Sequence, residues 1–405
     1  MKACILCIGE EVLNGKVINT NAAFISRELD KIGIRTERTV VIGDDPKMIE
    51  AELSLFKNSD AEILVTTGGL GPTRDDITKE VIFRSLGLVT ERKSEALKHL
   101  EDYFGKEYPL CNERQVLFPK EAFILENKLG TANGAIIRQQ EKTYIILVGP
   151  PVELVPMVKD SVRPYLLKET GESDSVVDFL VMGKGESEFE EYLSSFFNKY
   201  PKIKIASYPG GGQIRYEIRS NPQDRDEYQL ALLDFRNLMA EYIISDNGEG
   251  IEEVIIKLLK KKQWRISICE SCTGGMLSSM LVNVPGASKV FEEGFITYSN
   301  NSKMKYLGVK EETIREHGVV SSPVVLEMIE GLKKLNQADV LIGVSGIAGP
   351  GGGSLRKPVG LVHYGIMVKN ESISEAKVFK GNREQIRKKA CLWILYRLFL
   401  LIKDR

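Results

Sequence analysis

The sequence predicts an α/β protein with two three-layer αβα domains and a small α+β domain between them. Short apolar runs alternate with stretches of helical periodicity in residues 1–168 and again in 248–405. This order indicates a mostly parallel sheet with helices on both faces. The polar patches at 168–175 and 246–250 are typical of linkers. We therefore expect the small domain to occupy residues 169–247.

Composition and charge are those of an ordinary globular protein. The chain has 405 residues, 43% of them hydrophobic and 27% charged, and its formal net charge is −1. No block of one charge sign points to a nucleic-acid or membrane surface, so we expect neither as a direct partner. No apolar run approaches the length of a membrane span, and the run after Met1 and Lys2 is typical of a strand rather than a signal peptide. The cytoplasm is the expected location.

Cysteine and histidine usage argues against disulfides and against a metal site built from these two residue types. The six cysteines lie mostly in apolar runs, which indicates reduced thiols. Cys4 and Cys7 face opposite sides of a predicted strand and are interpreted as core residues. Cys269 and Cys272 lie at a strand–helix turn, where a thiol could be activated. A redox role for this pair is the less favoured interpretation. None of the three histidines has a neighbour at ligand spacing, which excludes a histidine-based zinc site.

The first part of the chain alternates strands and helices from its start. Its predicted elements, in chain order, are a strand at Ala3–Gly9, a helix at Asn21–Ile32, a strand at Arg35–Ile42, a helix after Pro46, a strand at Glu62–Thr67, a helix at Asp75–Leu86, and three strands at Phe123–Asn127, Ala135–Arg138 and Tyr144–Val148. The polar run Asn112-Glu113-Arg114-Gln115 precedes those last strands, and the turn Gly149-Pro150-Pro151 is expected to begin a helix that ends near Leu167.

The outstanding feature of this part is the glycine-rich run TTGGLGPTRDDIT, from Thr66 to Thr78. A glycine-rich turn at the carboxyl end of a parallel strand is where open α/β sheets bind ligands. Glycines also let backbone N–H groups approach a phosphate closely. Asp75 and Asp76, expected at the start of the next helix, can either cap that helix or hold a hard divalent cation against the phosphates.

The middle part has the order β-α-β-β-α-β over residues 176–245, and no chemistry is readable in it. The glycine run after Tyr208 and Pro209 resembles a nucleotide loop. It lies between two short strands, however, which favours a hairpin turn. We expect this part to be a structural spacer.

The last part is organised around the stretch Arg265–Lys305. The apolar run Ile266–Cys269 predicts a buried strand, and the sequence ESCTGG from Glu270 then turns the chain into a helix that ends near Val282. Such a turn leaves backbone N–H groups that can donate to an anion or oxyanion. On this segment alone, an ordinary strand–turn–helix with a Ser or Thr cap is an equal alternative.

The same stretch holds two more hydroxyls, on Ser288 and Tyr298, and one amine, on Lys303. A hydroxyl beside an amine that is kept neutral can hydrolyse an amide without histidine or metal. Each residue also has a plain interpretation: a helix cap for Ser288, a core ring for Tyr298 and solvated surface for Lys303.

A second glycine-rich loop, Ser345–Gly353, follows the predicted strand 339–344. It is again at a strand end, where a ligand phosphate or oxyanion is expected. After a strand at 361–367, a long helix closes the chain from Asn382. Arg383 lies in its first turn, where a cation opposes the helix dipole, and this favours a ligand role.

These motifs together resemble the CinA family of competence/damage-inducible proteins. The runs GEEVLNGKVINTN (Gly9–Asn21) and GGLGPTRDDITKE (Gly68–Glu80) are similar to its molybdopterin-binding-like N-terminal domain. ESCTGG, GFITYSNNSK (Gly294–Lys303) and SGIAGPGGG with KPVG (Ser345–Gly360) are similar to its C-terminal nicotinamide mononucleotide deamidase domain. The resemblance spans the whole chain in the family's order.

The resemblance implies two hydrolytic activities. The C-terminal domain would convert nicotinamide mononucleotide to nicotinate mononucleotide and ammonia, without a cofactor. The N-terminal domain would cleave the pyrophosphate of ADP-ribose to AMP and ribose 5-phosphate, with a divalent cation (Mg, Mn or Co) and potassium as expected cofactors. The family resemblance also implies a homodimer and a KH-like fold for the middle domain.

The family's functional residues can be carried over position by position. The deamidase residues fall on Ser271, Ser288, Tyr298, Lys303, Ser345 and Arg383, and further substrate contacts are expected from Thr273, Gly274, Gly275, Gly346, Gly349 and Gly351. In the first domain, phosphate contacts fall on Thr67, Gly68, Gly69, Gly71 and Thr73, and metal-binding acidic positions on Glu11, Asp44, Asp75 and Asp76. Departures at Asn133, Ser345 and Ser354-Leu355-Arg356 put only details of loop geometry in doubt.

The expected mechanism has Ser288 attack the carboxamide carbon while Lys303 takes its proton, with Tyr298 and Ser271 relaying or orienting. Lys303 must then be neutral in the free enzyme. The choice of Ser288 over Ser271 is the open point. Two hypotheses of other classes remain: a protein that holds a pterin without turnover, and an adaptor in competence or recombination.

Overall fold

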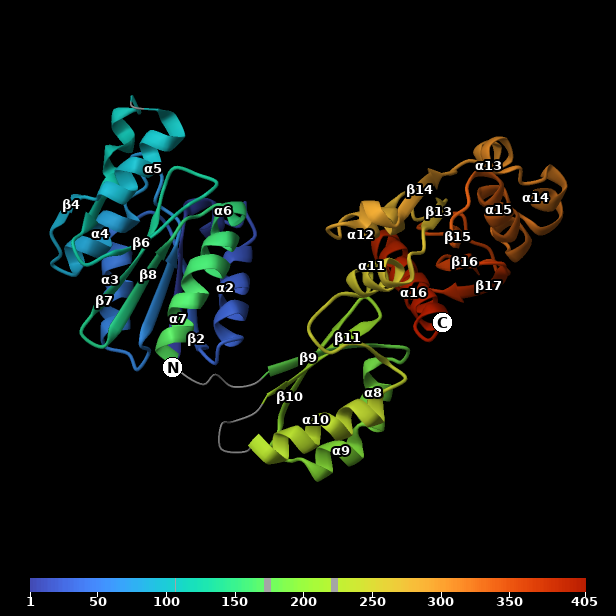
Figure 1. The fold of residues 1–405 in the computed structure, drawn as a ribbon, viewed down its shortest axis with the longest axis horizontal. Helices are drawn as coiled ribbons and strands as arrows, with labels where there is room; N and C mark the ends of the chain where they lie inside the picture. The colour runs from blue at the N-terminus through green and yellow to red at the C-terminus, as the bar shows by residue number, and fades with distance from the viewer. Residues whose placement is uncertain (106, 171–175, 220–224) are drawn as a thin grey trace. The chain divides into compact units, whose positions relative to one another are not determined.

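The computed structural model describes residues 1–105, 107–170, 176–219 and 225–405 (Figure 1). The chain forms two compact units, Met1–Ser175 and Val176–Arg405. The predicted linker at 168–175 begins inside a helix, because α7 (Arg163–Thr170) continues to Thr170. Residues 171–175 of that linker lie outside the described part.

The first unit is a six-stranded sheet between two layers of helices (Figure 1). Its strands are β1 (Lys2–Ile8), β2 (Arg35–Ile42), β3 (Ile63–Thr67), β6 (Phe123–Leu125), β7 (Gly134–Gln139) and β8 (Lys142–Leu147). They lie in the order β2-β1-β3-β8-β7-β6. The first four are parallel, whereas β7 and β6 are antiparallel to their neighbours. The carboxyl ends of β1 and β3 therefore meet at one edge.

Helices cover both faces of this sheet. On one face lie α2 (Thr20–Asp30), α6 (Pro151–Met157), a π-helical turn (Val158–Val162) and α7, and on the other lie α3 (Pro46–Lys57) and α4 (Thr78–Ser85). The remaining elements are α1 (Glu10–Leu13), α5 (Ser94–Phe104), the 3₁₀ helix η1 (Leu110–Val116) and a ribbon of β4 (Thr90–Arg92) and β5 (Leu117–Pro119). One continuous core, which includes the fully buried Ile63 and Ile145, joins the layers.

The second unit begins with a four-stranded antiparallel sheet in the order β10-β11-β9-β12. Its elements are β9 (Val176–Met182), α8 (Glu186–Tyr192), α9 (Ser194–Lys199), β10 (Lys204–Gly210), β11 (Gln213–Arg219), α10 (Arg225–Met239) and β12 (Ile243–Ser245). The β-α-β-β-α-β order is confirmed. The predicted hairpin is also confirmed, with Gly211 and Gly212 at positive φ in its turn. The KH-like label stays a prediction.

The rest of the second unit is a five-stranded sheet in the order β14-β13-β15-β16-β17. The strands are β13 (Ile266–Glu270), β14 (Phe291–Ile296), β15 (Val340–Gly346), β16 (Leu361–Val368) and β17 (Glu371–Val378). On one face lie α11 (Ile251–Lys262), α12 (Met276–Val282) and α16 (Arg383–Ile402), and on the other α13 (Asn300–Leu307), α14 (Glu311–His317) and α15 (Ser322–Leu335). β14, β13 and β15 run parallel.

Both α/β sheets are mixed. The prediction of mostly parallel sheets is wrong at one edge of each sheet, where the strands are antiparallel. β7 and β8 are joined by a two-residue turn at Gln140-Glu141, and β16 and β17 by one at Lys369-Asn370. Gln140 and Lys369 both have positive φ. Such short turns leave no room for a crossover helix, so the strands they join must be antiparallel.

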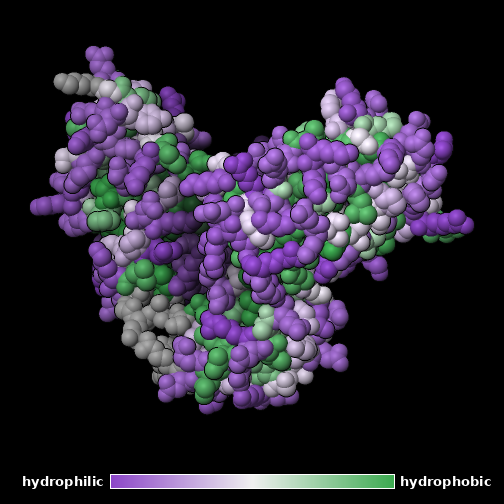
Figure 2. Space-filling model, turned by 45° about the vertical axis from the view of Figure 1, so that its right-hand side comes forward, coloured by the Kyte–Doolittle hydropathy of each residue, from purple (hydrophilic) through white to green (hydrophobic). Residues whose placement is uncertain are grey.

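In the described residues, no helix is long and apolar enough to span a bilayer. The face drawn in Figure 2 is mostly hydrophilic, with hydrophobic side chains in small groups.

Candidate active sites

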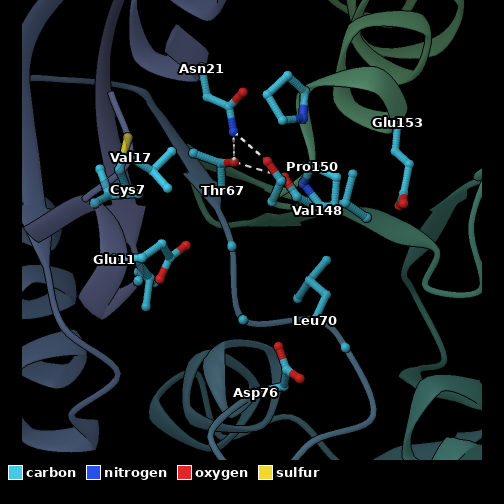
Figure 3. A pocket seen from close by; sticks show the side chains of 18 of the residues that line it. Cys7, Glu11, Val17, Asn21, Thr67, Leu70, Asp76, Val148, Pro150 and Glu153 are labelled. Atoms are coloured by element: carbon cyan, nitrogen blue, oxygen red, sulfur yellow. Dashed lines mark hydrogen bonds between the residues drawn. The ribbon is translucent and has the colours of Figure 1, made fainter. Parts of the chain in front are cut away.

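The glycine-rich run of the first unit lines a pocket of about 510 Å³ at the carboxyl edge of its sheet (Figure 3). Residues 67–72 form one wall, and the segments after β1 and β8 form the others. Gly68 has φ +104°, and a Cβ there would lie 2.0 Å from the carbonyl oxygen of Ile8. Only glycine allows the loop to pass this close to β1.

Thr67 lines this pocket, but its hydroxyl is already engaged. It donates to the carbonyl of Val148 at 2.7 Å. The side-chain amide of Asn21 donates to the Thr67 hydroxyl at 3.1 Å and to the Gly149 carbonyl at 2.7 Å (Figure 3). The Thr67 hydroxyl therefore links the end of β3 to the segment after β8, and it is not free to bind a phosphate. Asn21 was missed as a site residue, although it ends the first of the family-like runs.

Asp75 and Asp76 line the pocket but do not cap the next helix, which corrects that alternative. α4 begins at Thr78, and its N-cap Ile77 makes no side-chain capping bond. Asp76 instead accepts from the backbone N–H of Thr73 at 2.9 Å, and the Thr73 hydroxyl lies against both carboxylates. This hydroxyl lowers the pKa of Asp75. Thr73 closes the loop and is not among the pocket-lining residues.

Four carboxylates, those of Glu11, Asp44, Asp75 and Asp76, line the same pocket. Burial raises the pKa of Asp44, and the charges of the other three raise it further. Carboxylate oxygens are the donors that hard divalent cations prefer, so the donor set fits such an ion in kind. Within the described ranges no three acidic, histidine or cysteine side chains converge on one point, so binding an ion would require these side chains to draw together.

The second unit brings Ser271 and Lys303 together. Ser271 follows the last residue of β13, and Lys303 lies in the first turn of α13 with its side chain fully buried. The Lys303 Nζ is 2.9 Å from the Ser271 Oγ, 2.8 Å from the Thr297 carbonyl and 3.2 Å from the Tyr298 carbonyl. The described residues offer Lys303 no carboxylate within ion-pair distance.

This environment favours a neutral amine on Lys303. Burial lowers its pKa to about 8, because charge on a desolvated amine is costly. A neutral amine has two hydrogens and one lone pair. If the two N–H bonds are directed at the carbonyls of Thr297 and Tyr298, the lone pair faces the Ser271 hydroxyl, which can then donate its proton.

The start of helix α12 is occupied by the carboxylate of Glu270, which was not among the predicted site residues. The buried Glu270 accepts from the backbone N–H groups of Gly275, Leu277 and Ser278 at 2.8–3.2 Å, and from the Ser278 hydroxyl. Thr273, Gly274 and Gly275 do not line the pocket that opens beside Ser271 and Lys303. The helix start is therefore not free for an oxyanion, which corrects the expectation for those three residues. The signal was an acidic residue at the end of a predicted buried strand and ahead of a helix start.

A pocket of about 280 Å³ opens beside Ser271 and Lys303, and Ser345, Gly346, Gly349, Gly351 and Arg383 line it. The buried Ser345 hydroxyl donates to the Val319 carbonyl at 2.9 Å. Arg383 donates to the Gly349 carbonyl at 2.6 Å and to the Tyr298 hydroxyl at 3.0 Å. Among the described residues, the backbone N–H groups of Cys272, Gly351 and Gly352 have no acceptor. Burial raises the pKa of the Cys272 thiol to about 11, which argues against redox chemistry there.

Ser288 lies at the opposite end of the sheet from this pocket. It is exposed in the 3₁₀ turn Ala287–Lys289 that precedes β14. Val290, two residues on, accepts from the N–H of Ile266 at the start of β13, whereas Ser271 follows the end of that strand. A five-residue strand separates the two ends by roughly 16 Å. This geometry replaces Ser288 by Ser271 as the candidate nucleophile.

Comparison with known proteins identifies the lineage. The putative competence-damage inducible protein of Clostridioides difficile is 38% identical over 405 residues, and the match covers 96% of both chains. That of Caldicellulosiruptor saccharolyticus is 40% identical over 400 residues, again with 96% of each chain covered. The chain belongs to the CinA family.

Two family models divide the chain. The probable molybdopterin binding domain matches residues 4–168, and the CinA C-terminal domain matches residues 248–402. The molybdopterin-binding range holds the pocket with the four carboxylates, and the CinA C-terminal range holds the Ser271–Lys303 pair. A solved structure, the competence/damage inducible protein CihA from Agrobacterium tumefaciens, is 35% identical over 37% of this chain and 93% of its own, with a TM-score of 0.36.

Proposed function

We propose that the C-terminal CinA domain of this chain hydrolyses the carboxamide of nicotinamide mononucleotide. The observation that carries the proposal is the contact between the Ser271 hydroxyl and the buried amine of Lys303. A serine activated by a neutral lysine is a sufficient nucleophile for an amide. The pocket beside the pair is lined by no carboxylate or histidine within the described residues.

The reaction would pass through an ester on Ser271. The Ser271 oxygen attacks the carboxamide carbon, and Lys303 takes the hydroxyl proton. The unpaired N–H of Cys272, the residue after the nucleophile, would donate to the tetrahedral oxyanion. Lys303 then gives its proton to the leaving nitrogen, which departs as ammonia. Water attacks the ester with Lys303 again as base, and the proton returns to Ser271 as nicotinate mononucleotide leaves.

The rest of the pocket suits a nucleotide phosphate. The unpaired N–H groups of Gly351 and Gly352 and the guanidinium of Arg383 supply donors of the kind that bind phosphate. Arg383 donates to the Gly349 carbonyl and to the Tyr298 hydroxyl. It therefore links the glycine-rich loop to Tyr298, which also lines the pocket. The family resemblance then selects nicotinamide mononucleotide among small nucleotide amides.

For the N-terminal domain we propose hydrolysis of the ADP-ribose pyrophosphate. Glycines and four carboxylates line one pocket, and this combination suits a ligand with two phosphates together with a cation. Glu11, Asp44, Asp75 and Asp76 would hold the cation. When bound, it would neutralise phosphate charge and so assist attack by water.

One experiment tests both proposals. The purified chain is incubated with nicotinamide mononucleotide and, separately, with ADP-ribose and Mg²⁺, and the products are separated by chromatography. We expect nicotinate mononucleotide with ammonia in the first case, and AMP with ribose 5-phosphate in the second. Absence of either product pair refutes that activity. ADP-ribose or a pterin that binds without turnover would favour a ligand-holding role for the first domain.

A further inference from the structure

The polar run Asn112–Gln115 lies in the 3₁₀ helix η1, and none of its residues lines the first pocket. The run nevertheless contacts the glycine-rich loop. The side-chain amide of Gln115 donates to the Leu70 carbonyl at 3.2 Å, and Arg114 donates to the Thr73 carbonyl at 2.5 Å. Both acceptors flank the segment Gly71-Pro72, which does line the pocket.

The two donors are themselves held in place. Asn112 donates to the side-chain oxygen of Gln115 at 2.8 Å, and both side chains are buried. Arg114 also donates to Glu80 at 2.9 Å, and its carbonyl accepts from the buried amine of Lys79 at 2.8 Å. A buried amide with both ends bonded has one orientation, so Gln115 presents its N–H₂ group to the Leu70 carbonyl of the loop.

The hydrogen bond from Gln115 to the Leu70 carbonyl also sets the direction of the Gly71 N–H, because both groups belong to one peptide. In a trans peptide the carbonyl of one residue and the N–H of the next point in opposite directions. When Gln115 holds the Leu70 carbonyl on the η1 side, the N–H of Gly71 is directed away from η1. Gly71 lines the pocket and Gln115 does not. The Gly71 N–H has no acceptor among the described residues, so it is available to a ligand.

We propose that Gln115, supported by Arg114, is a positioning residue that orients the Leu70–Gly71 peptide so that the Gly71 N–H binds a ligand phosphate. The inference rests on the pyrophosphate-binding role proposed for this pocket. Gln115 fixes the donor before the ligand arrives, so no binding energy is spent on turning the peptide. Arg114 fixes the far end of the same segment at Thr73.

The test compares Gln115→Met with a matched control, Gln139→Met. Gln139 also donates its side-chain amide to a backbone carbonyl, that of Leu86 at 2.9 Å, in the same domain but away from the loop. A third variant, Gln115→Glu, still accepts from Asn112 but has no hydrogen to donate to Leu70 when ionised. Ammonia release from nicotinamide mononucleotide reports only the second unit, so a thermal melt of each variant checks that the first unit is folded.

We expect both Gln115 variants to lose roughly tenfold or more in kcat/KM for ADP-ribose, the scale of one lost hydrogen bond at a charged ligand, and to raise KM for it. Amide hydrogen exchange in peptides spanning residues 66–78 should also be faster in both. Gln139→Met should stay within twofold of the parent on each measure. Equal kcat/KM losses in the Gln115 variants and the control, or no loss in any variant, would overturn the inference.

Hydrogen exchange tests the role of Gln115, and ADP-ribose cleavage by the parent chain tests the function of the pocket. If the parent chain does not cleave ADP-ribose, the proposed function of the pocket is wrong, and the exchange data alone judge the role of Gln115. Faster exchange over residues 66–78 in the Gln115 variants and not in Gln139→Met would support the positioning role. Equal exchange in all three would contradict it.

Discussion

The amine of Lys303 lies 2.9 Å from the hydroxyl of Ser271, and the amine is fully buried. The two residues come from different elements: Ser271 follows β13 and Lys303 lies in the first turn of α13. The amine also contacts two backbone carbonyls, those of Thr297 and Tyr298. A lysine in this position has no structural partner of opposite charge among the described residues, which suits a base better than a salt-bridge partner.

The pH dependence of ammonia release should report the Lys303 amine. Burial lowers its pKa to about 8, and only the neutral form can take the Ser271 proton. Below pH 8 the neutral fraction falls tenfold per pH unit, so kcat/KM should be roughly a hundredfold lower at pH 6 than on the alkaline plateau. Initial rates with nicotinamide mononucleotide between pH 6 and 9.5 check this. A flat profile would contradict a lysine base.

Glu270 should matter for stability through the start of α12. Glu270→Ala leaves three backbone N–H groups without their acceptor, and we expect a loss of about 2–3 kcal/mol in the free energy of unfolding. Both tryptophans, Trp264 and Trp393, lie in the C-terminal domain, so urea unfolding followed by tryptophan fluorescence reports this domain. Glu330→Ala, at an exposed position of α15, is the control and should change stability by less than about 0.5 kcal/mol. Equal effects would rule out the capping role.

Metal removal should separate the two activities of one molecule. The first pocket is lined by Glu11, Asp44, Asp75 and Asp76, whereas the second is lined by no carboxylate among the described residues. Chelation should therefore stop ADP-ribose cleavage, and Mg²⁺, Mn²⁺ or Co²⁺ should restore it. Ammonia release should be unchanged throughout. If chelation leaves ADP-ribose cleavage intact, the four carboxylates have another role.

The sequence predicts the layers and most of the elements because hydrophobic periodicity determines them. The strand bounds at Arg35–Ile42 agree with the structure residue for residue. The errors lie where pairing is set by short turns, as at Gln140-Glu141, or where a helix begins later than its first acidic residue, as at Thr78. Neither feature has a strong periodic signal.

The candidate sites were predicted only in part, because the sequence does not show which strand end a residue reaches. Ser271 and Ser288 stand in equally polar contexts, yet one follows β13 and the other precedes β14, a strand parallel to it. The direction of β14 decides between them. The hydrogen bonds of Asn21, Glu270 and Gln115 join elements distant in the chain or depend on a helix start, and spacing alone does not reveal them.

The most direct test of the central claim is the rate of ammonia release by Ser271→Ala and Ser288→Ala, measured side by side on nicotinamide mononucleotide. Both substitutions remove one hydroxyl, and Ser288 is exposed, so folding is not at stake in the control. We predict that Ser271→Ala lowers kcat by roughly a thousandfold or more, whereas Ser288→Ala stays within twofold of the parent chain. Full activity in Ser271→Ala, or its loss in Ser288→Ala, would contradict the Ser271–Lys303 mechanism.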